Sequence, residues 1–405
     1  MPWLIWGISA AFVLYQFLLQ SAISVMIPQL MHDLRINILD IGLLSSSFFY
    51  PYVVLQIPAG ILVDRFGARI LLICSISLCV VASSLFSLSH GMDLAEWSRI
   101  LMGIASAPAV VCGMYLASRW FDKEKFAFVA GLVEMIGLFG GAVGQVCLAH
   151  LVTAWGWRAA MYVCVALALV LLLCTVIFVQ NQCQFKPRVS SQKTPVLVLL
   201  RKFLAVVFIP QVWIACIYSG LMFSIVTGFA GLWSIPFLQT RYGISADKAA
   251  TASALVFMGT ALGTGAIGWF ACRLGQLKII MTSMALISFV LMTSIIFIAM
   301  PLGLMWIMLL LLGFSCGAYV LAFAMVKKNT CSEISATAMG FTNMVCIVLG
   351  APVLQPLIGW ILVRSSHGAT GLSFVNYQDA LIPLPVFLLL AFLVALWIKD
   401  KPCIE

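Results

Sequence analysis

Apolar runs of about 20 residues recur along the whole chain, separated by short polar breaks. A run of this length can cross the hydrocarbon core of a bilayer as a helix, which satisfies its own backbone hydrogen bonds. The pattern predicts an all-α membrane protein with twelve transmembrane helices, at residues 4–29, 38–62, 69–88, 92–117, 127–152, 158–180, 204–235, 247–270, 278–300, 302–325, 334–362 and 379–398. The seventh and eleventh exceed the length needed to cross, which tilt or a broken helix would absorb.

Basic residues predict the orientation of these helices, because Lys and Arg concentrate in cytoplasmic loops. With the N-terminus in the cytoplasm, sixteen of the 22 Lys and Arg residues fall in inside segments, five in outside segments, and Arg99 within a span. We therefore expect both termini to be cytoplasmic. The expected location is a bacterial inner membrane, with the protein crossing it many times.

The overall composition supports the membrane assignment and excludes several other classes. Hydrophobic residues make up 63% of the chain and charged residues only 9%, whereas soluble domains average roughly a quarter charged. The net charge of +9 comes from short loops and forms no basic stripe, so nucleic acid is not an expected partner. The cysteines lie almost all within apolar runs without paired spacing, which predicts no disulfide framework.

A polar, basic connection in the middle of the chain predicts two domains. We expect an N-terminal six-helix bundle at 1–180, a cytoplasmic linker at 181–203 and a C-terminal six-helix bundle at 204–405. The loop after the second span reads GILVDRFGAR from Gly60, and the loop after the eighth reads GWFACRLG from Gly268. Both fit G-x-x-x-(D/C)-R-x-G at an offset of 268 − 60 = 208, which indicates two parallel repeats.

Several motifs together resemble the major facilitator superfamily over nearly the whole chain. They are the GILVDRFGAR loop, Arg99-x-x-x-Gly103 in the fourth span, Arg119-Trp120-Phe121 after it, and Gly156-Trp157-Arg158 before the sixth. The pieces QIPAG, LWSIPFL, GFTNM and QPLIGW further resemble a bacterial branch related to organic-anion-transporting and lysosomal peptide-transporting members. The resemblance implies two pseudo-symmetric six-helix bundles and secondary transport of a small solute by alternating access.

The GILVDRFGAR loop has the composition of an electrostatic latch. Its glycines would let backbones approach closely and turn tightly, and a carboxylate at a helix end can accept hydrogen bonds from arginines. The resemblance implies a latch that holds the two halves together in the outward-open state, formed by Gly60, Asp64, Arg65, Gly67, Arg69 and Arg119. Alternatively, these charges are solvated and only set topology. Cys272 replaces the aspartate in the second copy, so we expect a weaker latch there.

Two ionisable residues lie well inside predicted spans, where charges are costly and mark functional sites. Arg99 offers a planar fork suited to a carboxylate or phosphate. Its alternatives are snorkelling to the outer headgroups and bracing of helix packing. Glu134 could take a proton in turn, which makes it a candidate for proton coupling, or it could be a structural carboxylate satisfied by a neighbouring helix.

Polar and aromatic residues at helical spacing outline a possible solute cavity. They are Gln16, Gln20, Tyr52, Gln56, Tyr218, Tyr319 and Asn343. The resemblance implies that helices 1, 4, 7 and 10 line the path, which places Gln16, Arg99, Tyr218 and Tyr319 nearest to the solute. For each of these residues, ordinary interhelical hydrogen bonding or an aromatic interfacial role is an equal alternative.

The leading hypothesis is a proton-coupled symporter that imports a small organic solute, such as an organic anion or a peptide-like molecule. We expect no enzyme activity, cofactor or metal site, and a monomer whose partners are the solute, protons and the bilayer. The alternatives are an exporter of a siderophore or an amphipathic compound, and a transporter-like membrane receptor or sensor. The glycine stripe of the fifth span lacks the Gly-Pro of the superfamily's antiporter motif, which disfavours efflux; it comprises Gly137, Gly140, Gly141 and Gly144.

Overall fold

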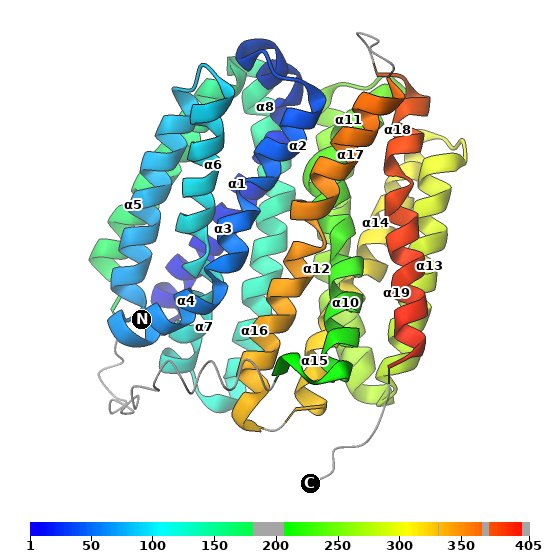
Figure 1. The fold of residues 1–405 in the computed structure, drawn as a ribbon. Helices are drawn as coiled ribbons and strands as arrows, with labels where there is room; N and C mark the ends of the chain where they lie inside the picture. The colour runs from blue at the N-terminus through cyan, green and yellow to red at the C-terminus, as the bar shows by residue number, and fades with distance from the viewer. Residues whose placement is uncertain (181–205, 331, 367–371, 399–405) are drawn as a thin grey trace. The chain divides into compact units, whose positions relative to one another are not determined.

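The computed structural model describes residues 1–180, 206–330, 332–366 and 372–398 (Figure 1). All regular elements in these ranges are helices, and their contacts divide the chain into two units. Unit 1 is Met1–Ser190 with Ser234–Gln239 and Gly243–Ala254, and unit 2 is the remainder of the chain. The predicted linker at 181–203 lies outside the described residues, and the predicted domain boundaries stay predictions.

Unit 1 is built from eight helices that account for the first six predicted spans. The predicted second span is divided into three helices and bends by 57° between Ile38–Val54 and Pro58–Phe66. The predicted fourth span is divided by Pro108, whose ring occupies the first turn of the next helix. The bounds are α1 Pro2–Leu34, α2 Ile38–Ser46, α3 Phe49–Val54, α4 Gln56–Phe66, α5 Ala68–Ser87, α6 Met92–Ser106, α7 Pro108–Trp120 and α8 Lys123–Phe178.

The predicted fifth and sixth spans run on as α8 and are separated by a turn at Gly156. This glycine has φ 81° and ψ 165°, a conformation that other residues rarely adopt. Gln29 accepts a hydrogen bond from the Trp157 amide at 2.8 Å, and Asp33 accepts one from the Trp157 indole at 2.9 Å and another from Arg158. The Gly-Trp-Arg motif therefore forms the turn and attaches it to the end of α1.

Both of the over-long predicted spans lie in the second half of the chain, and each of them is interrupted. The seventh includes a π-helix, Ile225–Trp233, and the eleventh breaks before α17 at Gly350. The bounds are α10 Pro210–Ser224, η1 Ile225–Trp233, α11 Ser234–Tyr242, α12 Ala246–Leu274, α13 Leu277–Phe297, α14 Leu302–Cys316, η2 Gly317–Val320, α15 Leu321–Lys328, α16 Ser332–Val348, α17 Ala351–Ser365, α18 Phe374–Leu381 and α19 Pro383–Leu396. Interrupted helices, rather than tilt alone, therefore accommodate the extra length.

Ten helices of the described chain are long and apolar enough to cross a membrane. One of them, Phe128–Phe178, holds two spans joined at Gly156, and the bent pair Ile38–Val54 and Pro58–Phe66 forms one more. The sum is 10 + 1 + 1 = 12 spans. The prediction of an all-α membrane protein with twelve transmembrane helices is confirmed.

Parts of α11 and α12 belong to unit 1, where α12 makes polar contacts with α8. Asp247, in the first turn of α12, accepts from His150 at 3.2 Å and lies 3.5 Å from the Thr153 hydroxyl. Ser234 and Ser253, both within unit 1, share a hydrogen bond of 2.6 Å between their hydroxyls. The contacts of Asp247 thus join the start of α12 to α8, and the serine pair joins α11 to α12.

The glycine stripe on α8 allows this helix to lie directly against α1. A Cβ atom at Gly140 would lie 2.4 Å from the Leu14 carbonyl oxygen, and one at Gly144 would lie 2.9 Å from the Leu18 Cα. Small residues allow such close approach between helices in membranes, where van der Waals packing replaces the hydrophobic driving force. The stripe therefore serves close packing of α8 against α1.

We predict that Gly140→Ala lowers the melting temperature of the purified protein, because the added methyl group would overlap the Leu14 backbone. Overpacking of this kind costs about 1–3 kcal/mol. Gly131→Ala on the same helix is the matched control, since a Cβ there meets no atom within 4 Å. Equal melting temperatures for the two variants would contradict this account of the α1–α8 contact.

Candidate functional site

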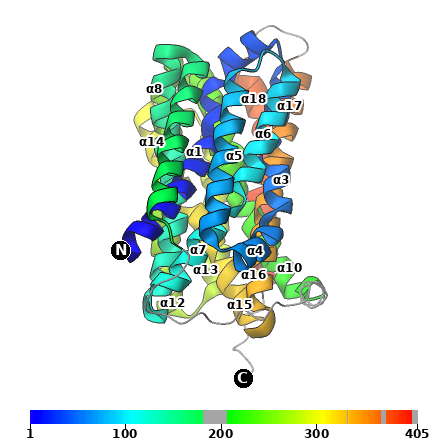
Figure 2. The same ribbon diagram turned by 90° about the vertical axis from the view of Figure 1, so that its left-hand side faces the viewer.

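Gly103 on α6 lets this helix touch the backbone of the second span. A Cβ at Gly103 would lie 2.0 Å from the Phe48 carbonyl oxygen, so no other residue fits without movement of one helix. Figure 2 shows α6 beside α5 and α3. Because residues four apart share a helix face, the contact brings Arg99 against the same stretch of the second span. The spacing of the Arg-x-x-x-Gly motif therefore has a direct structural reason.

Arg99 is buried in unit 1, with 1% of its surface exposed. Its Nη1 donates to the Leu19 carbonyl at 2.8 Å and its Nη2 to the Ser45 carbonyl at 3.4 Å. The guanidinium carbon lies 4.9 Å from the centre of the Phe48 ring, within cation–π range. A side chain buried to this degree does not reach the lipid headgroups, so the snorkelling alternative does not fit. The two carbonyl contacts join α6 to α1 and α2, as the helix-bracing alternative requires.

The charge of Arg99 has no counter-ion within ion-pair distance. No carboxylate in the described part of the chain lies within 4.0 Å of its nitrogens, and its buried Nε lacks a hydrogen-bond partner. An isolated buried charge is costly, and proteins normally pair it or bring a ligand to it. Binding of a solute anion by Arg99 stays a prediction.

Gln16 and Tyr52 extend the polar surface beside Arg99. The Gln16 amide donates to the Tyr52 hydroxyl at 3.0 Å, and the Tyr52 ring stacks on Phe48 with centres 5.9 Å apart. We call Gln16, Ser45, Phe48, Tyr52 and Arg99 the Arg99 cluster. Three buried atoms of this cluster lack partners: Gln16 Oε1, Ser45 Oγ and Arg99 Nε. They are an amide acceptor, a hydroxyl and a charged donor.

Glu134 lies on α8, half-buried, one turn before the glycine stripe. It acts electrostatically on the Tyr52 hydroxyl and so lies near the Arg99 cluster. No hydrogen bond or ion pair to its carboxylate occurs among the residues that the structure describes, so it does not pair with Arg99. Its roles as coupling group and as structural carboxylate both remain predictions.

The other predicted solute contacts lie in unit 2. Tyr218 is fully buried and donates to the Met281 carbonyl at 2.9 Å, which is the interhelical hydrogen bond named as its alternative. Tyr319 lies in η2, where its ring centre is 4.7 Å from that of Phe223. Asn343 is half-buried on α16, and the described residues offer it no hydrogen bond. A solute-binding role for these three residues stays a prediction.

The two glycines of the predicted latch differ in whether the structure requires glycine at their positions. Gly67 has φ 81° and needs to be glycine, as does Gly275 with φ 66° in the second copy of the motif. Close approach at Gly60 is not observed, because a Cβ there would meet no atom within 4 Å. That part of the prediction is wrong for this conformation, in which only Gly67 performs a glycine-specific role.

The charged latch residues lie at the ends of their helices. Asp64 is exposed and within electrostatic influence of Arg119, but no ion pair within 4.0 Å forms among the described residues. Arg69 donates to the Val176 carbonyl at 2.9 Å, near the end of α8. The guanidinium of Arg65 lies over Phe66 and that of Arg119 over Tyr115, each 5.3 Å from the ring centre. The latch itself stays a prediction.

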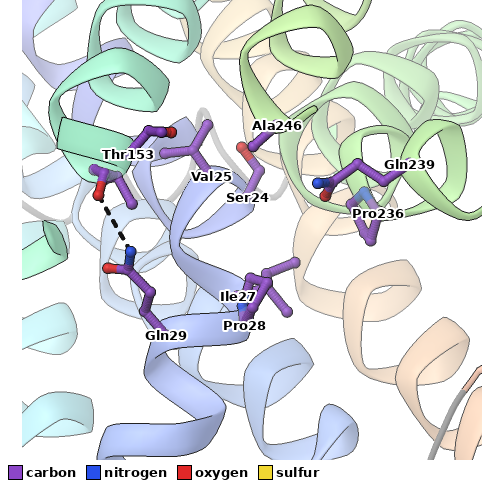
Figure 3. A pocket seen from close by; sticks show the side chains of 10 residues that line it. Ser24, Val25, Ile27, Pro28, Gln29, Thr153, Pro236, Gln239 and Ala246 are labelled. Atoms are coloured by element: carbon purple, nitrogen blue, oxygen red, sulfur yellow. Dashed lines mark hydrogen bonds between the residues drawn. The ribbon is translucent and has the colours of Figure 1, made fainter. Parts of the chain in front are cut away.

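A cavity of about 120 Å³ lies elsewhere in unit 1 (Figure 3). Ser24 and Gln29 from α1 line it together with Thr153 from α8 and Gln239 from α11. The Gln29 amide is engaged with the Val152 carbonyl at 3.2 Å. Small-molecule sites usually measure about 300–1,000 Å³. This cavity is therefore too small for an organic solute.

The chain belongs to the Major Facilitator Superfamily, whose family model matches residues 9–352. In fold it is similar to a bacterial homologue of the human lysosomal transporter Spinster, in an inward-facing and occupied conformation. That likeness has a TM-score of 0.78 and 15% identity, covering 99% of this chain and 98% of the other. Membership in this superfamily agrees with the resemblance of the sequence motifs to it and with the twelve transmembrane helices.

Curated relatives match over shorter stretches. A probable sulfoacetate transporter, SauU of Cupriavidus necator, is 27% identical over 42% of this chain and 40% of its own length. A probable L-galactonate transporter of Escherichia coli is 29% identical over 35% of this chain and 31% of its own. The membrane sensor protein UhpC of Escherichia coli is 22% identical over 63% and 61%. The chain thus spans less than two thirds of the length of these relatives.

Arg99→Lys tests the anion-binding role of the cluster. Lysine keeps the charge but loses the planar fork, so we expect the affinity for an anionic solute to fall by about 10-fold or more. Isothermal titration of the purified variant against wild type measures this change. Arg241→Lys is the matched control, since Arg241 donates to the Ile295 and Ile298 carbonyls in unit 2. Equal affinities for wild type and Arg99→Lys would show that the planar guanidinium of Arg99 does not contribute to solute binding.

Proposed function

We propose that this protein is a secondary active transporter that carries a small hydroxylated organic anion across a membrane by alternating access. The observation that carries the proposal is the buried Arg99 guanidinium, which has no carboxylate partner among the described residues. It belongs to a cluster in which Gln16 and Ser45 also keep an unpartnered atom. Relatives named as transporters of sulfoacetate and L-galactonate support an anionic substrate. A peptide-like substrate fits this set of groups less well, because the cluster contains no carboxylate for the ammonium group of a peptide.

Coupling to protons is part of the proposal. A buried cation attracts an anionic solute, and a carboxylate nearby can offset the charge of that cation when the solute leaves. Import with protons follows if both termini are cytoplasmic and the membrane is a bacterial inner membrane, as the distribution of Lys and Arg predicts. Glu134, near the Tyr52 hydroxyl, is one candidate for the proton-carrying group.

A second candidate function is sensing, in which solute binding changes the conformation without net transport. The match to the membrane sensor protein UhpC over 63% of this chain supports it. Both functions use the same binding site, so binding alone does not distinguish them. Accumulation of solute against its gradient does.

Reconstituted protein tests the proposal directly. We expect vesicles with an alkaline interior to accumulate labelled sulfoacetate or L-galactonate, and Arg99→Met to abolish this uptake. Collapse of the pH gradient should stop accumulation, whereas labelled and unlabelled solute should still exchange across the vesicle membrane. Binding with no uptake by wild type would favour the sensor, and neither binding nor uptake of any small organic anion would overturn the proposed substrate class.

Asp64→Asn tests the latch separately from solute binding. We expect expression and folding near those of wild type, because Asp64 is exposed and forms no ion pair within the described residues. Transport should fall severely if this carboxylate stabilises one of the two access states. Lys125→Gln, which removes another exposed charge beside a predicted inside loop, is the control. Unchanged uptake in Asp64→Asn would reduce the loop to a topology signal.

A further inference from the structure

Glu96 is a carboxylate beside the Arg99 cluster that the pattern of predicted spans did not single out. It lies on α6, three residues before Arg99, and is half-buried. Residues three apart on a helix are neighbours on one face. Glu96 is thus the carboxylate on the same face of α6 nearest in sequence to Arg99, although no ion pair within 4.0 Å joins them.

The hydroxyl of Ser47 holds Glu96 against the second span. Its oxygen lies 3.1 Å from a carboxylate oxygen of Glu96 and 2.8 Å from the Leu43 carbonyl oxygen, and Ser47 is almost fully buried. A serine hydroxyl has one proton and so can donate to only one of these acceptors at a time. When Glu96 is ionised, its carboxylate and the Leu43 carbonyl compete for this proton.

Protonation of Glu96 removes that competition. The acid would donate to the Ser47 oxygen, while the Ser47 hydroxyl donates to the Leu43 carbonyl, so both short contacts become hydrogen bonds. Ionised Glu96 instead offsets the charge of Arg99 from one helical turn away. Ionised Glu96 therefore suits an Arg99 without a bound anion, and the neutral acid suits an Arg99 with one.

We propose that Glu96 carries the co-transported proton, taking it up when an anionic solute binds Arg99 and releasing it when the solute leaves. The inference rests on the proposed anion transport. Two negative charges beside one guanidinium repel each other, so arrival of a solute anion favours the neutral acid of Glu96. One proton then accompanies each bound solute anion, and for a singly charged solute such as L-galactonate the charge of the site is the same in the empty and loaded states.

Other titratable groups around α6 are distant in sequence or engaged elsewhere. The helices packed against it are α1, α2, α3 and α5. Asp33 pairs with Arg158, Asp40 caps the start of α2, and Arg69 bonds the Val176 carbonyl. Asp93 on α6 is exposed. The remaining titratable groups on these helices are Tyr15, His32, Tyr50, Tyr52, Cys74 and Cys79, none of which is a carboxylate.

Infrared difference titration of the purified protein in nanodiscs tests Glu96 without any solute. On acidification, we expect wild type to gain a carbonyl band of a hydrogen-bonded carboxylic acid that Glu96→Gln lacks. Ser47→Ala should retain this band but shift its frequency, because its hydrogen-bond partner is removed. Glu134→Gln and Asp93→Asn should retain it unchanged. Identical spectra for wild type and Glu96→Gln would overturn the inference, whether or not any solute is transported.

Proton uptake on solute binding provides the second measurement, with whichever of sulfoacetate or L-galactonate wild type accumulates. In weakly buffered solution we expect about one proton per bound solute carboxylate for wild type and Asp93→Asn, and none for Glu96→Gln. Glu96→Gln should still exchange solute across vesicles but not concentrate it on a pH gradient. If Glu134→Gln abolished proton uptake while Glu96→Gln retained it, Glu134 would be the coupling group and the inference would be wrong.

Discussion

The contact between Gly103 and the Phe48 carbonyl is the constraint on which the N-terminal site depends. In hydrocarbon, backbone and charged groups need partners within the protein, because no water is present to form hydrogen bonds with them. At Gly103 the absence of a side chain brings α6 against the backbone of the second span, and Arg99 then reaches the Ser45 and Leu19 carbonyls. A charged side chain is thereby held inside the bundle without a permanent counter-ion.

The same packing recurs in unit 2 without the charge. A Cβ at Gly313 would lie 2.1 Å from the Val256 carbonyl oxygen, the counterpart of Gly103 against Phe48 at offsets of 313 − 103 = 210 and 256 − 48 = 208. One turn before Gly313 stands Leu309, fully buried, where the first half has Arg99. Helix packing is therefore duplicated, whereas the buried arginine occurs only in the first of these two contacts. The loop motif differs between the halves in the same way, because the first copy has the charged Asp64 where the second has the uncharged Cys272.

Unpartnered polar atoms have a different meaning in this chain from their meaning in a soluble core. Each one left in an apolar interior costs free energy, and proteins keep few of them. Here Gln16, Ser45 and Arg99 each retain one such atom within a single cluster. A ligand that satisfied them would gain affinity from groups that the empty protein leaves unpaired, which is how a site can discriminate a hydroxylated anion from an apolar solute.

The sequence alone determined the class of fold, because a span of about 20 apolar residues has one common solution in a bilayer. It also predicted the turn at Gly67, which rests on local geometry, whereas the helix that covers the glycine stripe of α8 was not predicted. Tertiary structure decided which polar residues meet. Tyr218 donates to a backbone carbonyl of α13, while Ser45 and Phe48, which no motif marked, contact Arg99. Periodicity gives the face of a helix but not the neighbour that covers it, and the fate of a buried polar group depends on that neighbour.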